Sequence, residues 1–386
     1  MPSSHSFMPR NRCLAVAAAA ALLTLLWQAA TVHVNYGGNW SALFYIGDRW
    51  PLPPALAGEA YVHPNSAGYD GVFYHMVAHD PWFTRGFSRF ADNASLRWRR
   101  ILTPALAHLF AAGADAHTHS AYIMVNLLFV FLGALWLARY SAIQGLNPAY
   151  GLAFIGVPSV LVSMDRLTID TALAAFTVGF ILYFSANRPV AAIVVLALAP
   201  LARETGLALT TGHAWSNLRD RKWKLFLLTL MSALPFALWS SFVFAHTPAD
   251  GTAWLSIPFA GIVRRTIHPL QYSITGPWVA LAAIFDYLAL IGIWIALALT
   301  VRQAVRRSFD LITCCILSFA LGALCLGKAD IWAGAYEFGR TMSPLLILLG
   351  LLALRDRKLL FLLPLACTLP RILLQLEPQV RGILRH

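Results

Sequence analysis

Long apolar runs cross the sequence, and they restrict the chain to one kind of fold. The first run, Leu14–Val34, contains no charged residue and follows Arg10 and Arg12. About 20 apolar residues cross a bilayer as a helix. Charged residues make up 12% of the chain, whereas soluble domains carry roughly 25%. We therefore predict an all-α, polytopic membrane protein rather than a soluble domain with a large core.

Further apolar runs follow the polar segment 35–100. Several are only about 14 residues long, so they are tilted, paired, re-entrant or interfacial, and hydropathy does not decide between these. We expect about 10 to 12 membrane segments in a single integral membrane domain covering residues 1–386. These runs lie at 101–114, 119–138, 149–164, 170–187, 189–202, 205–218, 225–245, 278–301, 310–327, 341–354 and 358–376.

The first run has two interpretations. A cleaved signal peptide has a shorter apolar core and a small-residue cleavage site. Leu14–Val34 is longer and more spans follow it. We therefore prefer an uncleaved anchor.

The net charge of +12 invites a nucleic-acid partner. The basic residues, however, cluster at the ends of apolar runs, at Arg219–Lys224, Arg302–Arg307 and Arg355–Lys358. Loops with such clusters tend to be cytoplasmic. No segment combines a basic patch with interleaved aromatics, so we predict no nucleic-acid partner and a cytoplasmic N-terminus.

With this orientation, the loops 35–100, 246–277 and 328–340 face outward, and the first two are large. The number of crossings between 101 and 211 is ambiguous. If 101–114 lies in the interface without crossing, Arg139 falls inside and Asp165-Arg166 outside. We favour that arrangement.

The first loop contains the stretch GYDGVFYHMVAHDP. Asp70 suits the N-cap of a helix from Gly71 to about His79, which ends before Pro81 because the residue preceding a proline avoids helical geometry. One side of this helix would be apolar and lie on the membrane surface. That side consists of Phe73, Met76 and Val77.

The same stretch also permits catalysis. Asp70 and Tyr74 are four residues apart, so they share a face of the helix. A carboxylate beside the bilayer meets lipid headgroups at their own depth and can act as a general base on an acceptor hydroxyl. A capping acid can also be catalytic, so the two interpretations are compatible.

Asp70, Tyr74 and Ala78 fit a D-x-x-x-Y-x-x-x-A pattern. This pattern resembles the first-loop motif of polytopic GT-C glycosyltransferases, which include lipid A aminoarabinose transferases and protein O-mannosyltransferases. More closely, YDG-x-FY-x-x-x-A-x-DP resembles a bacterial inner-membrane family implicated in cell-surface glycopolymer formation. The resemblance covers this motif and the layout of an anchor, a large first loop and many helices.

The resemblance implies a polyprenyl-phosphate sugar donor, a lipid-linked or surface glycan acceptor, and an active site on the periplasmic side of the inner membrane. Asp70 would be the catalytic base that activates the acceptor hydroxyl, with inversion at the anomeric carbon. Asp80 fits the DP position without an assigned role. The loop lacks the D-E or D-x-D pair of several GT-C branches, so no cofactor is predicted with certainty, and a divalent metal is an open alternative without support.

Charged residues within membrane segments are costly and are therefore functional candidates. Arg203 offers a bidentate fork to a donor phosphate, unless Arg203 and Glu204 form a solvated turn. Being adjacent, these two need not pair with each other. The candidate substrate-binding residues are Tyr74, Asp80, Arg100, Asp165, Arg166, Arg203, Glu204, Glu337 and Arg340.

Each of the other candidates has a structural alternative. Asp165 and Arg166 can belong to a plain loop, in which Asp170 caps the next helix. Glu337 and Arg340 are close enough to pair on a helix, and Arg340 resembles a late external arginine that meets lipid phosphate in GT-C families. The outer cluster Arg97, Arg99 and Arg100 either neutralises an anionic headgroup or only anchors a surface helix.

Two weaker signals concern a metal and an isolated acid. His117 and His119 are an i, i+2 pair that chelates a metal only in an extended conformation, and no second cluster completes a site in the sequence. We therefore predict no metal site. Asp286 lies inside an apolar run, and we expect it to pair with an arginine of a neighbouring helix.

The resemblance makes a membrane glycosyltransferase the leading hypothesis. The chain has neither a Walker A motif nor a dinucleotide-binding fingerprint, so an enzyme of this kind would take its sugar from a lipid carrier. The alternative is a transporter or flippase for a lipid-linked saccharide, which the Arg203-Glu204 interruption suits but the lack of a visible repeat does not. A non-catalytic assembly component is a third option.

Overall fold

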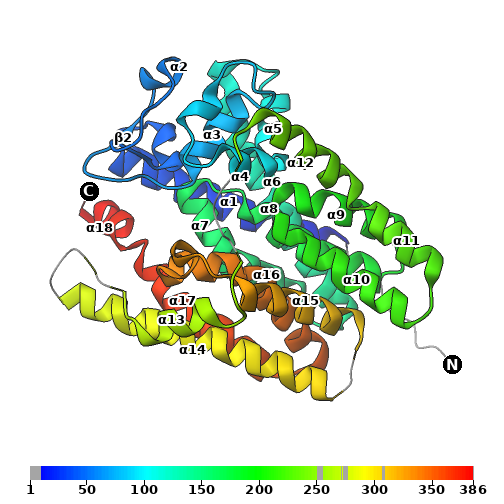
Figure 1. The fold of residues 1–386 in the computed structure, drawn as a ribbon. Helices are drawn as coiled ribbons and strands as arrows, with labels where there is room; N and C mark the ends of the chain where they lie inside the picture. The colour runs from blue at the N-terminus through cyan, green and yellow to red at the C-terminus, as the bar shows by residue number, and fades with distance from the viewer. Residues whose placement is uncertain (1–9, 250–254, 271, 273–276, 307–308, 386) are drawn as a thin grey trace.

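The computed structural model describes residues 10–249, 255–270, 272, 277–306 and 309–385. These residues are nearly all helical or in loops, apart from the short parallel strand pair β1 (Ile46–Gly47) and β2 (Val62–His63) in the first loop. The all-α fold is therefore confirmed (Figure 1). The predicted loop 246–277 and the cluster Arg302–Arg307 lie partly outside the described residues.

Five helices of the described chain are long and apolar enough to cross a membrane, or up to seven if two bent pairs each count as one span. The pairs are bent by 60° and 49°. This confirms a polytopic membrane protein. The five are α1 (Arg10–Asn35), α6 (Asp115–Ile143), the stretch Trp223–His246 formed by α11 (Trp223–Met231) and α12 (Leu234–His246), α14 (Pro277–Val305) and α16 (Ala335–Asp356). The bent pairs are η3 (Pro148–Gly156) with α7 (Pro158–Arg166), and Leu359–Leu374, formed by η6 (Leu359–Leu362) and α17 (Leu363–Leu374), with α18 (Glu377–Arg385).

Several expected membrane segments are short helices in the structure. The helices α8 (Asp170–Ser185), α9 (Pro189–Ala202) and α15 (Leu311–Cys325) have 16, 14 and 15 residues. At about 1.5 Å per residue they extend roughly 21 to 24 Å, less than the hydrocarbon thickness of about 30 Å. The 10 to 12 segments expected from the sequence therefore include both helices that are long enough to cross the membrane and shorter apolar helices.

The first loop carries the short helices α2 (Pro54–Ala57), α3 (Gly71–His79) and α4 (Ala94–Arg99). The predicted bounds of α3 are confirmed. Its predicted position on the membrane surface is wrong, because every residue of α3 is buried in the protein. The apolar side chains expected to face lipid pack against the rest of the loop and the bundle instead. These side chains are Phe73, Met76 and Val77.

The segment after the first loop forms α5 (Leu102–Phe110), which packs against α3 and α6. Its nine residues extend about 14 Å, so α5 is too short to cross the bilayer. This agrees with the arrangement in which 101–114 does not cross.

The basic clusters predicted to be cytoplasmic gather at one end of the helix bundle. Arg219, the last residue of α10 (Leu207–Arg219), donates to the carbonyl of Phe309. Arg355 donates to Asp310 at 2.5 Å. In Figure 1 α11, which follows the cluster Arg219–Lys224, lies at the right, whereas α2 and α3 of the first loop lie at the upper left. The first loop therefore covers the end of the bundle away from these basic clusters.

Candidate functional site

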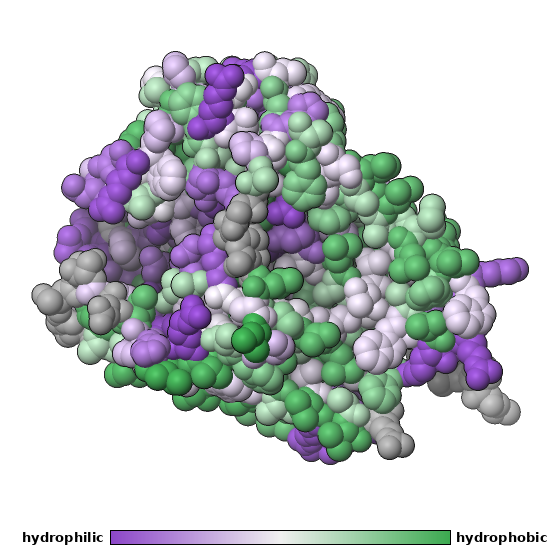
Figure 2. Space-filling model, viewed as in Figure 1, coloured by the Kyte–Doolittle hydropathy of each residue, from purple (hydrophilic) through white to green (hydrophobic). Residues whose placement is uncertain are grey.

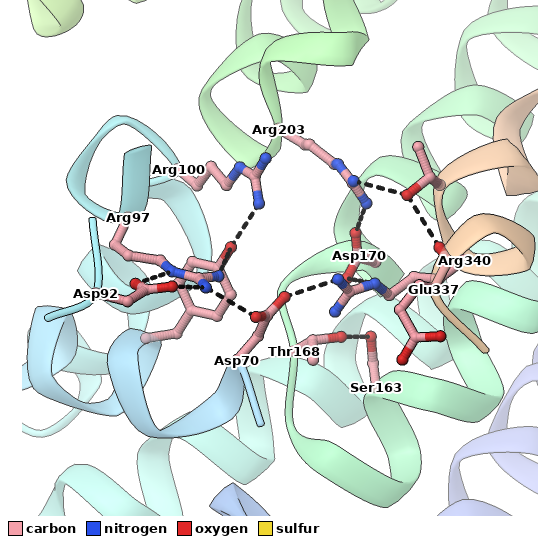
Figure 3. A network of polar contacts seen from close by, with 12 residues as sticks. Asp70, Asp92, Arg97, Arg100, Ser163, Thr168, Asp170, Arg203, Glu337 and Arg340 are labelled. Carbon is pink, nitrogen blue, oxygen red and sulfur yellow. Dashed lines mark hydrogen bonds and ion pairs between the residues drawn. The ribbon is translucent and has the colours of Figure 1, made fainter. Parts of the chain in front are cut away.

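Asp70 lies immediately before α3 and joins two arginines from distant parts of the chain (Figure 3). Its side chain makes no capping hydrogen bond to the helix. Instead Arg97 Nη2 donates to Oδ1 at 2.8 Å, and Arg340 Nη2 donates to Oδ2 at 2.7 Å. Burial raises the pKa of Asp70, but the two guanidiniums outweigh it and hold the pKa well below its usual range. Asp70 is therefore a carboxylate at neutral pH.

Arg97 connects Asp70 to the rest of the first loop. Its Nε and Nη2 donate to both carboxylate oxygens of Asp92, at 2.9 and 2.6 Å. Its Nη1 donates to the hydroxyl oxygen of Tyr74 at 3.3 Å. Asp70 and Tyr74, predicted to share a helix face, therefore contact the same guanidinium.

Arg100 links the first loop to the break between α9 and α10. Its Nε and Nη2 donate to the two oxygens of Glu204 at 2.8 and 2.5 Å, and its Nη1 donates to Tyr74 at 2.8 Å. Glu204 begins the one-turn helix η4 (Glu204–Gly206) that separates α9 from α10. The interruption is therefore a charged contact between two layers of the protein rather than a solvated turn.

Arg203 does not pair with its neighbour Glu204 but has partners on other helices. It forms a short ion pair with Asp170, the first residue of α8, and donates to Thr341 at 3.1 Å. The expectation that Arg203 and Glu204 need not pair with each other is confirmed. Asp170 is therefore a member of the charged network and not only a helix cap.

Arg340, on the first turns of α16, is buried between Asp70 and Asp170. Its Nε lies 3.6 Å from Asp170, and its guanidinium lies over the ring of Tyr69 at 5.1 Å. These carboxylates, rather than Glu337, are its ion-pair partners. Nη1 of Arg340 is buried and has no hydrogen-bond partner among the described residues, so this guanidinium has an unsatisfied donor beside the cavity.

A cavity of about 810 Å³ connects these side chains. Asp70, Arg100, Glu204, Glu337 and Arg340 line its polar part, together with Asp92, Arg97 and Arg203. Much of the remaining wall is apolar, and most of that part comes from α10, α15 and α16. The apolar lining includes Leu207, Ala208, Leu317, Phe319, Leu321, Ala323, Met342 and Leu345.

Two lining residues place one side of the cavity at the outer surface of the bundle. Trp215 and Leu321 line the cavity, and their relative exposures are 49% and 61%. In Figure 2 hydrophobic residues form most of the lower edge and much of the right-hand part of the face, while hydrophilic residues gather at the left and in the centre and also at the lower right. The cavity therefore combines a charged interior with an apolar side at the protein surface.

Four predicted residues lie outside the cavity lining. Tyr74 is one of them, although it contacts the lining residues Arg97 and Arg100. Asp80 accepts hydrogen bonds from the backbone of Thr84 and Phe87, at 2.7 and 3.1 Å, and so shapes the loop after α3. Asp165 and Arg166 bond to each other at 2.7 Å on α7. The structure does not bring Asp80 or this pair to the cavity.

The pair on α7 has structural partners instead. Asp165 accepts hydrogen bonds from Tyr336 at 2.8 Å and from Gln379 at 3.0 Å. The guanidinium of Arg166 lies on the ring of Tyr45. These contacts fasten α7 to α16, to α18 and to the first loop.

Sequence reasoning left three members of the network out of the candidate site. Arg97 was recognisable as part of a basic cluster on the predicted outer face, and Asp170 as an acid at the head of an apolar run. Asp92 carried no signal beyond its position in the loop. Its role depends on the fold that places it against Arg97.

The isolated acid Asp286 behaves as predicted. It lies on α14, and two arginines of other helices pair with it: Arg265 at 3.4 Å and Arg371 at 3.3 Å. The latter is on α17, and the former is on α13 (Ala260–Ile267). None of the three lines the cavity, so this cluster is a separate structural contact.

The fold and the site together define a class, namely a polytopic helical membrane protein with a charged, partly apolar cavity at one end of the bundle. Comparison with known proteins takes the assignment no further. No family model, no curated protein and no solved structure matches this chain.

Proposed function

We propose that this protein is a GT-C-type membrane glycosyltransferase that transfers a sugar from a polyprenyl-phosphate donor to a lipid-linked or surface glycan acceptor. The observation that carries the proposal is the amphipathic cavity. It places a carboxylate and several guanidiniums beside an apolar wall that continues to the exposed Trp215 and Leu321. A polyprenyl-phosphate sugar has the same sequence of parts: sugar, phosphate and hydrocarbon.

The donor phosphate would lie against Arg340. A guanidinium offers two parallel donors to a phosphate, and Nη1 of Arg340 has no hydrogen-bond partner among residues 10–249, 255–270, 272, 277–306 and 309–385. Arg203 lies on the same cavity wall and contributes a second positive charge. The isoprenoid would follow the apolar wall of α10 and α15 towards lipid.

Asp70 would be the general base. In the transfer, its carboxylate takes the proton of the acceptor hydroxyl, and the acceptor oxygen bonds to the anomeric carbon. The bond between that carbon and the phosphate oxygen breaks, and the polyprenyl phosphate leaves with the electron pair, held by the arginines. Attack from the opposite side inverts the anomeric centre.

The two ion pairs of Asp70 would make its basicity depend on donor binding. A carboxylate paired with two guanidiniums is a weak base. When the donor phosphate draws Arg340 towards itself, Asp70 loses part of that stabilisation and becomes a stronger base. Donor binding would therefore activate the base.

By the positive-inside argument, the active site would face the periplasm in a bacterial inner membrane. The end of the bundle that carries Asp70 is opposite the end that carries the basic clusters Arg219–Lys224 and Arg355–Lys358. That separation is the arrangement the proposal requires.

The test uses purified full-length protein in liposomes with a panel of radiolabelled polyprenyl-phosphate sugars and a lipid-linked acceptor fraction. Label that moves from donor to acceptor, with release of polyprenyl phosphate, supports the transferase. Movement of intact donor between leaflets without release of polyprenyl phosphate supports a flippase and overturns the proposal. If no donor in the panel is either transferred or moved between leaflets, that result also counts against the proposal.

A further inference from the structure

Three histidines meet between α3 and α6, in a place that no step of the proposed reaction uses. Within the described residues, the only group of three or more potential metal ligands within mutual reach is His75, His79 and His119, whose ligand atoms all lie within 4.8 Å of one another. His75 and His79 are one turn apart on α3, and His119 is on the first turns of α6. None of the three lines the cavity.

The rings are arranged around a common centre. Nε2 of His79 lies 2.9 Å from Nε2 of His75. The ring centroids of His75 lie 4.6 Å from those of both His79 and His119. Nitrogens bound to one tetrahedral zinc at 2.0–2.1 Å are about 3.3 Å apart, so the two rings of α3 need to open by about 0.4 Å and His119 needs to move inward. His119 is only half-buried, and this leaves its ring room to turn.

A carboxylate fixes the tautomer of one ring. Asp115 Oδ1 lies 2.6 Å from Nδ1 of His79, and Arg85 holds the same carboxylate through bonds of 2.6 and 2.8 Å. Nδ1 of His79 therefore carries the proton, and the lone pair of Nε2 points at the centre of the group. A carboxylate behind a metal-binding imidazole is the usual second partner of such a ligand.

The surroundings of His75 hold its ring in one orientation. His75 has 1% relative exposure, and its ring is stacked on Phe44 at 4.1 Å. This packing fixes the plane of the imidazole.

We propose that His75, His79 and His119 bind one divalent transition metal, with zinc the best match to three imidazole ligands. A water completes the coordination, and the bound metal fastens α3 to α6. Because α3 carries Asp70 at its start and Tyr74 in its first turns, the metal positions the charged network without touching the substrate. This proposal does not depend on the function proposed above.

The proposal differs from the sequence analysis on one point, namely that no second cluster completes a metal site. The segment around His117 is helical from Asp115 onward, so the i, i+2 pair points in two directions and does not chelate. The cluster that completes the site comes from α3, and His75 and His79 belong to it. No metal site was predicted, because residues 40 positions apart carry no signal of proximity.

The experiment measures metal bound to the full-length protein in detergent, purified through a tag without histidines, loaded with zinc and desalted. The test variant is His119→Gln, because His119 is the most exposed ligand. The matched control is His117→Gln, two residues away on the same helix, exposed and outside the cluster. We expect the unmodified protein and the control to retain about one zinc per chain, and the test variant to retain at least tenfold less.

A second measurement protects the test against misfolding. Cobalt in place of zinc gives intense visible bands in a tetrahedral nitrogen site, and these should appear in the unmodified protein and in His117→Gln but not in His119→Gln. Equal zinc retention by all three proteins, or an unmodified protein without the cobalt bands, would overturn the proposal. In the latter case the rings form only a hydrogen-bonded array with Asp115.

Discussion

Arg340 donates a hydrogen bond of 2.7 Å to Asp70, although 270 residues separate them in the chain. The bond joins the first loop to α16. Asp70 also binds Arg97 of its own loop, and Arg340 also contacts Asp170 of α8. One carboxylate and one guanidinium thus hold three segments of the chain at the edge of a cavity.

Asp70→Asn should abolish sugar transfer while leaving the fold intact. The amide keeps the shape of the side chain but takes no proton, and general bases contribute roughly 10²- to 10⁴-fold to rates. Asp92→Asn is the matched control, since it removes the other carboxylate of Arg97 and leaves the base in place. We expect the control to be destabilised, because Arg97 is buried, but to stay within about tenfold of the unmodified rate per folded molecule. A transfer assay with equal amounts of folded protein decides, and full activity of Asp70→Asn would remove this residue from the mechanism.

Arg340→Lys should weaken donor binding more than it slows the chemical step. Lysine keeps the positive charge but loses the fork that binds a phosphate through two parallel bonds. A lost charged hydrogen bond costs about 1.5–3 kcal/mol, so the KM for donor should rise roughly 10- to 150-fold. Arg371→Lys is the control, because Arg371 pairs with Asp286 away from the cavity. An unchanged donor KM in Arg340→Lys would exclude this arginine as the phosphate ligand.

Glu204→Gln should destabilise the protein. Arg100 has 5% relative exposure and gives two hydrogen bonds to this carboxylate, so the substitution leaves a buried guanidinium with less compensation. Glu204 itself is more exposed, which lowers the cost to about 1–3 kcal/mol. The thermal midpoint in detergent measures the effect. The double variant Arg100→Gln/Glu204→Gln should be less destabilised than the sum of the single changes, and strict additivity would show that the pair is not coupled.

The contribution of Asp70 to stability should be constant between pH 8 and pH 5. Its folded-state pKa lies below the usual value of about 3.9. A depressed pKa gives stability that is present above the unfolded-state pKa and is lost as the pH falls towards the folded-state pKa. The difference in thermal midpoint between the unmodified protein and Asp70→Asn should therefore begin to shrink only below about pH 4. A decline centred near pH 6 would contradict the low pKa.

The sequence predicts what depends on local patterns and fails where distant segments meet. The bounds of α3 were predicted from local residues, Asp70 at its start and Pro81 after its end, and they are right although the side chain of Asp70 makes no capping hydrogen bond. The membrane class follows from the apolar runs. The sequence predicts that Asp286 pairs with an arginine, because a buried acid needs a cation. It does not predict which arginine this is.

The composition of the site depends on tertiary structure. Asp70 was predicted as a cap and possible base, yet its two partners come from α4 and α16. Asp165 and Arg166 interrupt an apolar run as visibly as Arg203 and Glu204 do, but only the second pair reaches the cavity. The two charged pairs interrupt apolar runs of similar hydropathy. Only the tertiary structure determines which of the two pairs lies at the cavity.

The apolar wall that ends at Trp215 and Leu321 determines which concentration of a lipid ligand sets its binding. A molecule that slides in from the bilayer never passes through water, so its mole fraction in the membrane, and not its amount per volume, sets the occupancy of the cavity. Adding inert phospholipid to vesicles of fixed ligand content would then slow the protein by surface dilution alone.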